Sequence, residues 1–278
     1  MNLFALAALG LGWVAAAEPG HPQIGAGPLL AAHRGGAALW PENSLLAFRN
    51  SVALGADFLE LDVHLSRDGE VVVIHDATLD RTTSGAGPVT DRTLAELRAV
   101  GLRDKSGGAS AERIPSLGDV LALASAAGRA VLLEIKPDAR GVRYPGIEER
   151  VLAAVDAHRM ARSVVVMAFE AETWRRVREL RPEVRAGALY SSRTLRAPGR
   201  VARAIEEAHA AGVGFVGLQH PLATAEVQAL AGQAGILLGA WTVNAPADMR
   251  RLIDQRVGVL ITDRPDIARQ LLEQRGNP

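Results

Sequence analysis

The sequence predicts a (β/α)₈ barrel, and three observations carry that prediction. Apolar runs of strand length alternate with longer amphipathic segments from Leu29 onward. There are eight such runs, and Gly or Pro marks the boundaries of most of them. Eight strands that alternate with helices within about 250 residues are the number and order of elements in a (β/α)₈ barrel. A doubly wound open sheet shows the same alternation and is the alternative architecture.

The expected strands are 29–33, 58–63, 130–136, 163–169, 184–189, 214–218, 236–243 and 258–262. Between them, apolar residues near 3.6 spacing predict helices, among them 171–181, 223–235 and 246–256. Glu42 and Asn43 stand where the first helix, 44–55, begins, and Asn43 is the expected N-cap. No linker divides the chain, so 18–278 is expected to be one domain.

One interval breaks this rhythm. About forty residues separate the apolar run that ends at Ile74 from the helix expected near Ser116, whereas βα loops usually have about two to six residues. The interval contains one helical pattern, 93–100, and then a Gly/Ser-rich turn. We therefore expect an insertion at about 76–115, after the second strand region, placed as a cap over one face of the barrel.

The first seventeen residues, 1–17, are uncharged and mostly apolar. Such a run is shorter than the roughly 20 residues that span a bilayer as a helix. Ala15 and Ala17 match the small-x-small pattern of a signal-peptidase site, although no Lys or Arg precedes the apolar run. The segment predicts a signal peptide and export to the periplasm or medium. The alternative is an uncleaved N-terminal helix of a cytoplasmic protein.

The amino-acid composition excludes several kinds of partner and of catalytic or metal site. Lys and Arg total 31, as do Asp and Glu, so the net charge is zero and gives no electrostatic case for nucleic acid or an anionic membrane. The chain has no Cys, which excludes disulfides, thiolate nucleophiles and Cys-ligated zinc. Any metal must be held by carboxylates, His or carbonyls, which favours hard cations such as Ca²⁺ or Mg²⁺.

Carboxylates occur in two of the expected strands. Glu60 and Asp62 lie two residues apart in a strand and so point to the same, inward face. Glu134 and Lys136 repeat the arrangement on the next barrel strand. Because isolated buried charges are costly, the three acids are predicted to bind a divalent metal, Ca²⁺ or Mg²⁺. A structural salt-bridge network around Lys136 is the alternative.

Two histidines follow apolar runs. His33 and Arg34 end the first strand, and His75 and Asp76 follow the run that ends at Ile74. Active sites of (β/α)₈ enzymes lie at the C-terminal ends of strands, where all these residues fall. The Arg34 guanidinium suits a phosphate, and two histidines suit acid and base roles in phosphoester cleavage near neutral pH.

Weaker candidates complete the set. Three side chains at the ends of later strands are predicted to line the substrate pocket, with packed barrel-mouth residues as the alternative: Phe169, Gln219 and Trp241. His64 is expected on the strand face opposite Asp62, in a helix-facing or surface position.

Together the motifs resemble the glycerophosphodiester phosphodiesterases. The resemblance rests on HRGG…PENSLLAF, GADFLELDVHLSRDGEVVVIHDATLDRTTSGAGPV, LLEIKP, AWTVN and GVLITDRPD, and runs from His33 to about Asp266. It implies a (β/α)₈ barrel that hydrolyses a small-molecule glycerophosphodiester to glycerol 3-phosphate and an alcohol such as choline, ethanolamine or glycerol. The implied acid/base pair is His33 and His75. The implied phosphate contacts are Arg34 and Lys136, and the metal ligands are Glu60, Asp62 and Glu134.

Three other functions are alternatives to this one. A lysophospholipase D would use the same chemistry on a longer substrate and would need an apolar groove, which the 4% aromatic content disfavours. A non-catalytic binding protein would be expected to lack one of the two His or three acids, and none is missing. A barrel isomerase or lyase would usually carry a Lys base on a later strand, but the only lysines are Lys105 and Lys136.

Overall fold

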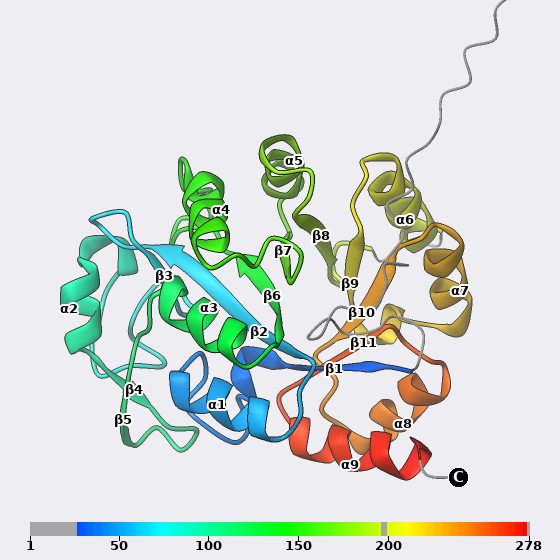
Figure 1. Ribbon diagram of the computed structural model, residues 1–278, viewed down its shortest axis with the longest axis horizontal. Helices are drawn as coiled ribbons and strands as arrows, with labels where there is room; N and C mark the ends of the chain where they lie inside the picture. Colours follow the sequence, from blue (N-terminus) through cyan, green and yellow to red (C-terminus); the bar gives the residue numbers. More distant parts are fainter. Residues whose placement is uncertain (1–26, 196–198, 277–278) are drawn as a thin grey trace, which may run out of the picture.

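A computed structural model describes residues 27–195 and 199–276. Its main sheet has nine strands, and eight of them are parallel and closed into a barrel because the first strand pairs with both the second and the last. The closure excludes the open sheet, and all eight expected strands are confirmed (Figure 1). The barrel strands are β1 (Leu29–Ala32), β2 (Phe58–Leu65), β6 (Ala130–Ile135), β7 (Val164–Ala168), β8 (Arg185–Tyr190), β9 (Phe215–Gln219), β10 (Leu237–Trp241) and β11 (Val259–Thr262).

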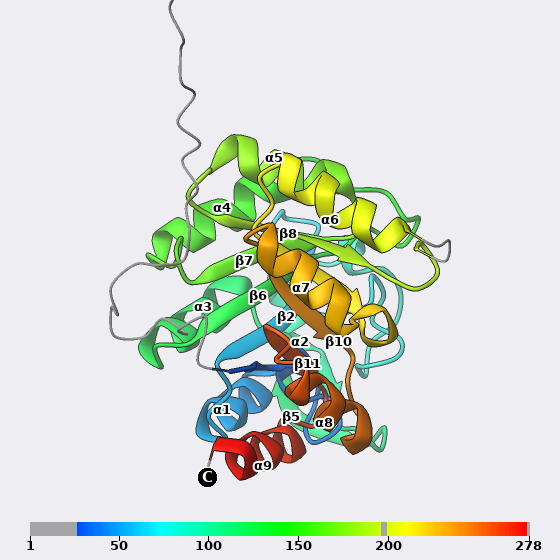
Figure 2. The same cartoon turned by 90° about the vertical axis from the view of Figure 1, so that its right-hand side faces the viewer.

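Helices surround the barrel on its outer side (Figures 1 and 2). They are α1 (Leu45–Ala53), α3 (Leu117–Ala126), α4 (Ile147–Ala157), α5 (Ala171–Leu180), α6 (Arg200–Ala210), α7 (Ala225–Gln233), α8 (Pro246–Asp254) and α9 (Pro265–Gly276). Three short 3₁₀ turns lie at His33–Gly35, Val89–Asp91 and His220–Leu222. Within the described ranges, no helix combines the length and the apolar character needed to cross a membrane.

Strand residues alternate between two buried layers. One layer packs between the strands and the helices, and the other fills the barrel interior. In the interior, Phe215 lies so close to Gly239 that a Cβ on this glycine would stand 2.6 Å from the Phe215 ring. Likewise, a Cβ on Gly217 would stand 2.5 Å from Leu189. Large side chains on some strands therefore occupy space that glycines leave open on others.

The insertion is a small structured unit beside β2, seen at the cyan to green end of the barrel in Figure 1. It begins with β3 (Val71–Val73), which pairs antiparallel with the end of β2. It continues through α2 (Leu94–Ala99) to a hairpin of β4 (Gly101–Arg103) and β5 (Ala109–Arg113). The helix expected at 93–100 is confirmed, and Thr93 caps it together with Glu96 in a capping box. β3 and the hairpin were not predicted.

The expected N-cap of α1 is wrong by one residue. Ser44 caps the helix, because its side chain accepts a hydrogen bond from the Ala47 amide. Asn43 instead has a left-handed backbone, with φ of 57°, and is buried with its side chain turned toward β2. The expected signal peptide, 1–17, lies outside the described residues and stays a prediction.

Candidate active site

The inner row of side chains on each barrel strand continues to the C-terminal mouth of the barrel. Because side chains of a strand alternate between its faces, the residue two positions beyond an interior side chain also points inward. The interior residues Ala31, Phe58, Leu132, Val165, Phe215, Leu237 and Ile261 start or continue these rows. The rows end at the mouth in His33, Glu60, Asp62, Glu134, Phe169, Gln219, Trp241 and Asp263.

Three buried acids form the centre of the mouth. One carboxylate oxygen from each of Glu60, Asp62 and Glu134 lies within 4.8 Å of the other two. Burial raises the pKa of Glu60 to about 7, with His33 opposing the rise and Asp62 adding to it. Burial also raises the pKa of Glu134, against the effect of Lys136. A cation bound beside these buried acids would favour their ionised form, which burial by itself disfavours.

The donor set fits a hard divalent cation. Asp62 Oδ1 is buried without a hydrogen-bond partner among the described residues, although Lys136 Nζ stands 3.6 Å away. Oxygens from three carboxylates are ligands that Ca²⁺ and Mg²⁺ prefer. Burial favours the neutral form of Asp62, but Lys136, His75 and Arg34 together hold its pKa well below the usual range. At least one of the three acids is therefore ionised at neutral pH.

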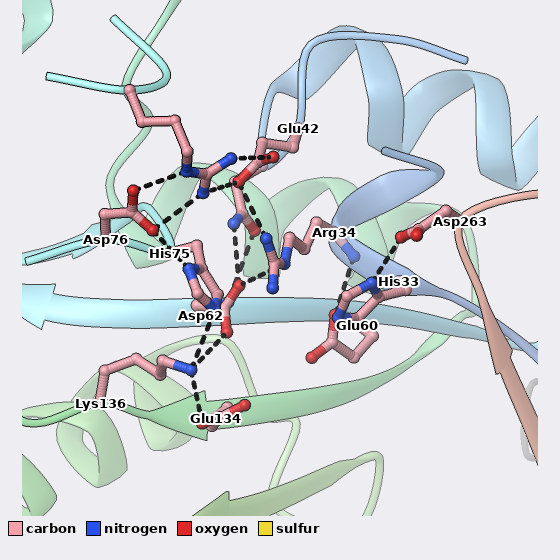
Figure 3. Close-up of polar contacts among 12 residues, drawn as sticks. His33, Arg34, Glu42, Glu60, Asp62, His75, Asp76, Glu134, Lys136 and Asp263 are labelled. Atoms are coloured by element: carbon pink, nitrogen blue, oxygen red, sulfur yellow. Dashed lines mark hydrogen bonds and ion pairs between the residues drawn. The ribbon is translucent and has the colours of Figure 1, made fainter. Parts of the chain in front are cut away.

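Lys136 links the acids to the second histidine. Its Nζ lies 2.8 Å from Glu134 Oε1 and 3.2 Å from His75 Nε2 (Figure 3). The salt-bridge network that was the alternative to a metal site is thus present around Lys136. It pairs the lysine with Glu134 and Asp62 and leaves Glu60 to other partners. A network of this kind and a metal site use the same residues.

His33 is held by a carboxylate on the last barrel strand. Its Nδ1 lies 2.6 Å from Asp263 Oδ1, and Asn244 donates to the other Asp263 oxygen at 2.6 Å. This leaves His33 Nε2 3.9 Å from Glu60 Oε2. Burial disfavours the charged ring, but Glu60 and Asp263 outweigh burial and raise the pKa of His33.

His75 has the same kind of support from the insertion. Its Nδ1 lies 2.6 Å from Asp76 Oδ1, so Nε2 faces Lys136. Burial and the neighbouring cations Lys136 and Arg34 lower the pKa of His75, although Asp62 opposes them. Arg81 binds both oxygens of Asp76, at 2.6 and 2.9 Å. In each histidine a carboxylate at Nδ1 fixes the ring and leaves Nε2 to face the site.

Arg34 crosses the acid cluster from the turn after β1. Its backbone is left-handed, with φ of 50°, and its amide donates to Glu60 Oε2 at 2.8 Å. Its Nε lies 3.4 Å from Asp62 Oδ2, and Nη1 donates to Glu42 at 3.2 Å. Glu42 also accepts two hydrogen bonds from Arg81, at 2.9 and 2.8 Å. One carboxylate therefore ties Arg34 to the insertion.

Two expectations about neighbouring residues are wrong. Asn43 does not cap α1, because its Nδ2 donates to Asp62 Oδ2 at 3.0 Å. His64 does not face away from Asp62, since residues two apart share a strand face, and it is buried rather than at the surface. Its ring contacts Tyr144 and the His75 carbonyl, and burial lowers the pKa of His64 to about 4.

The three predicted pocket residues reach the mouth but have different surroundings. Phe169 is 39% exposed and meets Trp241 edge to face, with ring centroids 5.6 Å apart. Trp241 Nε1 is buried without a hydrogen-bond partner among the described residues. The side-chain oxygen Oε1 of Gln219 accepts hydrogen bonds from the Ser192 amide at 2.9 Å and the Ser192 hydroxyl at 2.5 Å. Phe169 and Trp241 are thus available to a ligand, whereas Gln219 already holds a loop.

Sequence reasoning missed four site residues. Asp263 continues the inner row of β11 and could have been found by counting two residues on from Ile261. Asn244 supports Asp263 and ends the motif AWTVN, but its spacing alone gives no reason to single it out. Glu42 and Arg81 meet across 39 positions of the chain, so the sequence contains no signal for their contact.

Comparisons with known proteins identify the family. The model of the Glycerophosphoryl diester phosphodiesterase family matches residues 33–267. A glycerophosphodiester phosphodiesterase from Caldanaerobacter subterraneus subsp. tengcongensis is 36% identical over 252 residues, which cover 89% of this chain and 99% of the relative. The structure of an Agrobacterium tumefaciens protein, provisionally named a glycerophosphoryl diester phosphodiesterase, is 27% identical with a TM-score of 0.82, covering 90% of this chain and 99% of its own.

An Oleispira antarctica phosphodiesterase, solved in complex with the product sn-glycerol-3-phosphate, is 24% identical. It has a TM-score of 0.73 and covers 89% of this chain and 97% of its own, and it supports the shared barrel fold. The family match spans the turn of His33, the acid cluster and the insertion with His75. The chain therefore belongs to the glycerophosphoryl diester phosphodiesterase family.

Proposed function

We propose that this enzyme hydrolyses glycerophosphodiesters to glycerol 3-phosphate and an alcohol, with a divalent cation and two histidines. One observation carries the proposal. His33 and His75 each bind a carboxylate through Nδ1, and their Nε2 atoms face the same cluster of three buried acids (Figure 3). The family membership of the chain supports the substrate class.

The residues of the chain divide the work of the reaction. Arg34 and Lys136 bring positive charge to the mouth, where they bind phosphate oxygens and orient the diester. Glu60, Asp62 and Glu134 would hold Ca²⁺ or Mg²⁺, which when bound supplies further positive charge to the phosphate. The aromatic pair of Phe169 and Trp241 is placed to contact the organic part of the substrate.

The histidines move the protons. One imidazole accepts the proton of the attacking hydroxyl at Nε2 as the new P–O bond forms. The other donates a proton from Nε2 to the alkoxide that leaves as the old P–O bond breaks. Proton exchange with water then returns both imidazoles to their starting states before the next turnover. Attack by water and attack by the glycerol 2-hydroxyl through a cyclic phosphate place the same demand on the pair.

The surface favours a glycerophosphodiester over a lysophospholipid. Among the described residues, the exposed large apolar side chains are Val142 and Phe169. An acyl chain would need a continuous apolar groove, because leaving its methylene groups in water forfeits about 0.8 kcal/mol for each. Two separate side chains do not form such a groove. A glycerol-linked head group needs none.

The first test removes one histidine at a time. His33→Ala or His75→Ala should lower kcat on glycerophosphocholine by about 100-fold or more while the melting temperature stays within a few degrees. His209→Ala, on the exposed side of α6, is the matched control and should keep full turnover. Near-normal turnover of His75→Ala would contradict the two-histidine mechanism. Faster turnover of lysophosphatidylcholine than of glycerophosphocholine would contradict the substrate class.

A further inference from the structure

A fourth side chain of the inner row of β2 has no part in the proposed chemistry. His64 follows Glu60 and Asp62 on the same strand face and is 1% exposed. Both its ring nitrogens are hydrogen-bonded. Nδ1 lies 2.8 Å from the Tyr144 hydroxyl, and Nε2 lies 3.0 Å from the backbone carbonyl of His75. The ring therefore presents no free polar atom to a substrate.

The two partners define one tautomer of His64. A backbone carbonyl only accepts hydrogen bonds, so His64 Nε2 must carry the proton and donate it to His75. Nδ1 is then the acceptor, and the Tyr144 hydroxyl donates to it. The Tyr144 ring meets His64 at 85° with centroids 5.8 Å apart, and Tyr144 is 7% exposed. Packing holds the pair as well as the hydrogen bonds.

This pair supports His75 at the point where strand pairing has ended. β3 ends at Val73, and the Ile74 amide still donates to the Asp62 carbonyl at 3.0 Å. The next carbonyl, that of His75, no longer takes part in strand pairing. Among the described residues, it accepts one hydrogen bond, from His64 Nε2. The side chain of His75 is oriented separately, by Asp76.

We propose that His64 and Tyr144 are positioning residues that hold the backbone of His75 so that its Nε2 faces Lys136 and the acid cluster. The inference rests on the role of His75 in the proposed function. A displacement of about 1 Å in a catalytic group can cost about 100-fold in rate. Holding the His75 backbone in place therefore preserves the rate, which explains why two polar side chains are buried beside it.

The kinetic test compares loss of the donor with its replacement. His64→Leu removes both hydrogen bonds and should lower kcat on glycerophosphocholine by about 10- to 100-fold, with KM within about twofold. His64→Gln restores an amide donor for the His75 carbonyl and should recover most of that loss. A purely structural role would lower stability in both variants without this split between kcat and KM or this rescue. Wild-type kcat in a folded His64→Leu would overturn the inference.

Tyr144→Phe keeps the test decisive if His64→Leu does not fold. It deletes one hydroxyl and should lower kcat by about threefold to tenfold. Added to His64→Leu it should cost nothing further, because both changes break one chain of contacts. Tyr190→Phe is the matched control. Tyr190 packs on the outer side of the barrel, and its hydroxyl makes no hydrogen bond within the described ranges, so its loss should leave kcat unchanged.

A spectroscopic readout tests the geometry apart from activity. In long-range ¹H–¹⁵N spectra of the ¹⁵N-histidine-labelled chain, the signals lost in His64→Gln should be those of a neutral ring protonated at Nε2. A ring protonated at Nδ1 would contradict the contact with His75. If wild-type protein does not hydrolyse the diester, or if His75→Ala remains fully active, the proposed function fails. If wild type hydrolyses the diester, His75→Ala does not, and the His64 and Tyr144 variants match wild type, only the positioning inference fails.

Discussion

Glu60 and Asp62 are neighbours in one inward row, yet their pKa values move in opposite directions. Burial favours the neutral form of both acids. Lys136, His75 and Arg34 reverse this effect on the pKa of Asp62, whereas at Glu60 His33 opposes the rise without cancelling it and the charge of Asp62 adds to it. Asp62 thus remains an anion that organises the cations of the site. Glu60 ionises at a cost unless another cation arrives.

This asymmetry predicts a stabilising substitution. The folded-state pKa of Glu60, about 7, exceeds its ordinary value of 4.5, so the metal-free protein loses stability as pH rises from 4.5 to 7. At pH 8, metal-free Glu60→Gln should therefore be more stable than wild type by about 1 to 3 kcal/mol. The difference should vanish near pH 4.5. Urea unfolding in EDTA at the two pH values measures it.

The same variant tests the cation. Ca²⁺ or Mg²⁺ at about 100 times its Kd should stabilise wild type by about 2.7 kcal/mol and should stabilise Glu60→Gln much less. EDTA should abolish turnover of wild type, and one of the two ions should restore it. A melting temperature unaffected by either ion would argue against a metal site at these acids.

At the residue scale, the sequence predicts the groups that lie at strand ends but not their partners. The two-residue period places Glu60, Asp62 and Glu134 correctly, and the same rule applied to His64 would have placed it on their face. Contacts such as Glu42 with Arg81 depend on how the insertion packs against the barrel. That packing has no local signature.

At the scale of elements, the insertion contributes His75 and Arg81 to the candidate active site. Its own small core contains Ile74, which directly precedes His75, and Val72. Both pack with Leu79, Leu97 and other apolar side chains. Arg81 extends from the same unit to Asp76 and Glu42. The position of His75 therefore depends on how well this small core packs.

Leu97→Ala tests that dependence. Leu97 is fully buried in α2, so its truncation should cost about 2 to 5 kcal/mol and lower kcat even well below the melting temperature. Leu121→Ala, a fully buried leucine of α3 against the barrel, is the matched control. It should destabilise by a similar amount and keep kcat. Equal loss of activity in both variants would show that overall stability, rather than the insertion, governs turnover.

Elements differed in how well the sequence revealed them. The barrel strands are buried on both faces and consist mostly of apolar residues, so all eight are evident. β3 has only three residues, and β5 alternates exposed and half-buried side chains without a strong apolar signal. Short strands at the surface are formed by their tertiary partners rather than by their own composition.

For the whole molecule, barrel closure requires side chains of unequal size to share the interior. Gly239→Ala would place a Cβ 2.6 Å from Phe215 and should destabilise the protein by about 1 to 3 kcal/mol. Gly232→Ala in α7, where a Cβ meets nothing within 4 Å, should instead stabilise it by about 0.5 to 1 kcal/mol. Thermal unfolding of the two variants checks both signs. A neutral Gly239→Ala would mean that the interior has room to spare.

The length of β2 has a consequence for how this site can change. Phe58, Glu60, Asp62 and His64 share one face, which runs from the barrel interior to the support of His75. Deleting a single residue ahead of Phe58 would turn all four outward together. Individual side chains along β2 can therefore be exchanged one at a time, but a shift of one position would displace a core residue, two of the three clustered acids and His64 together.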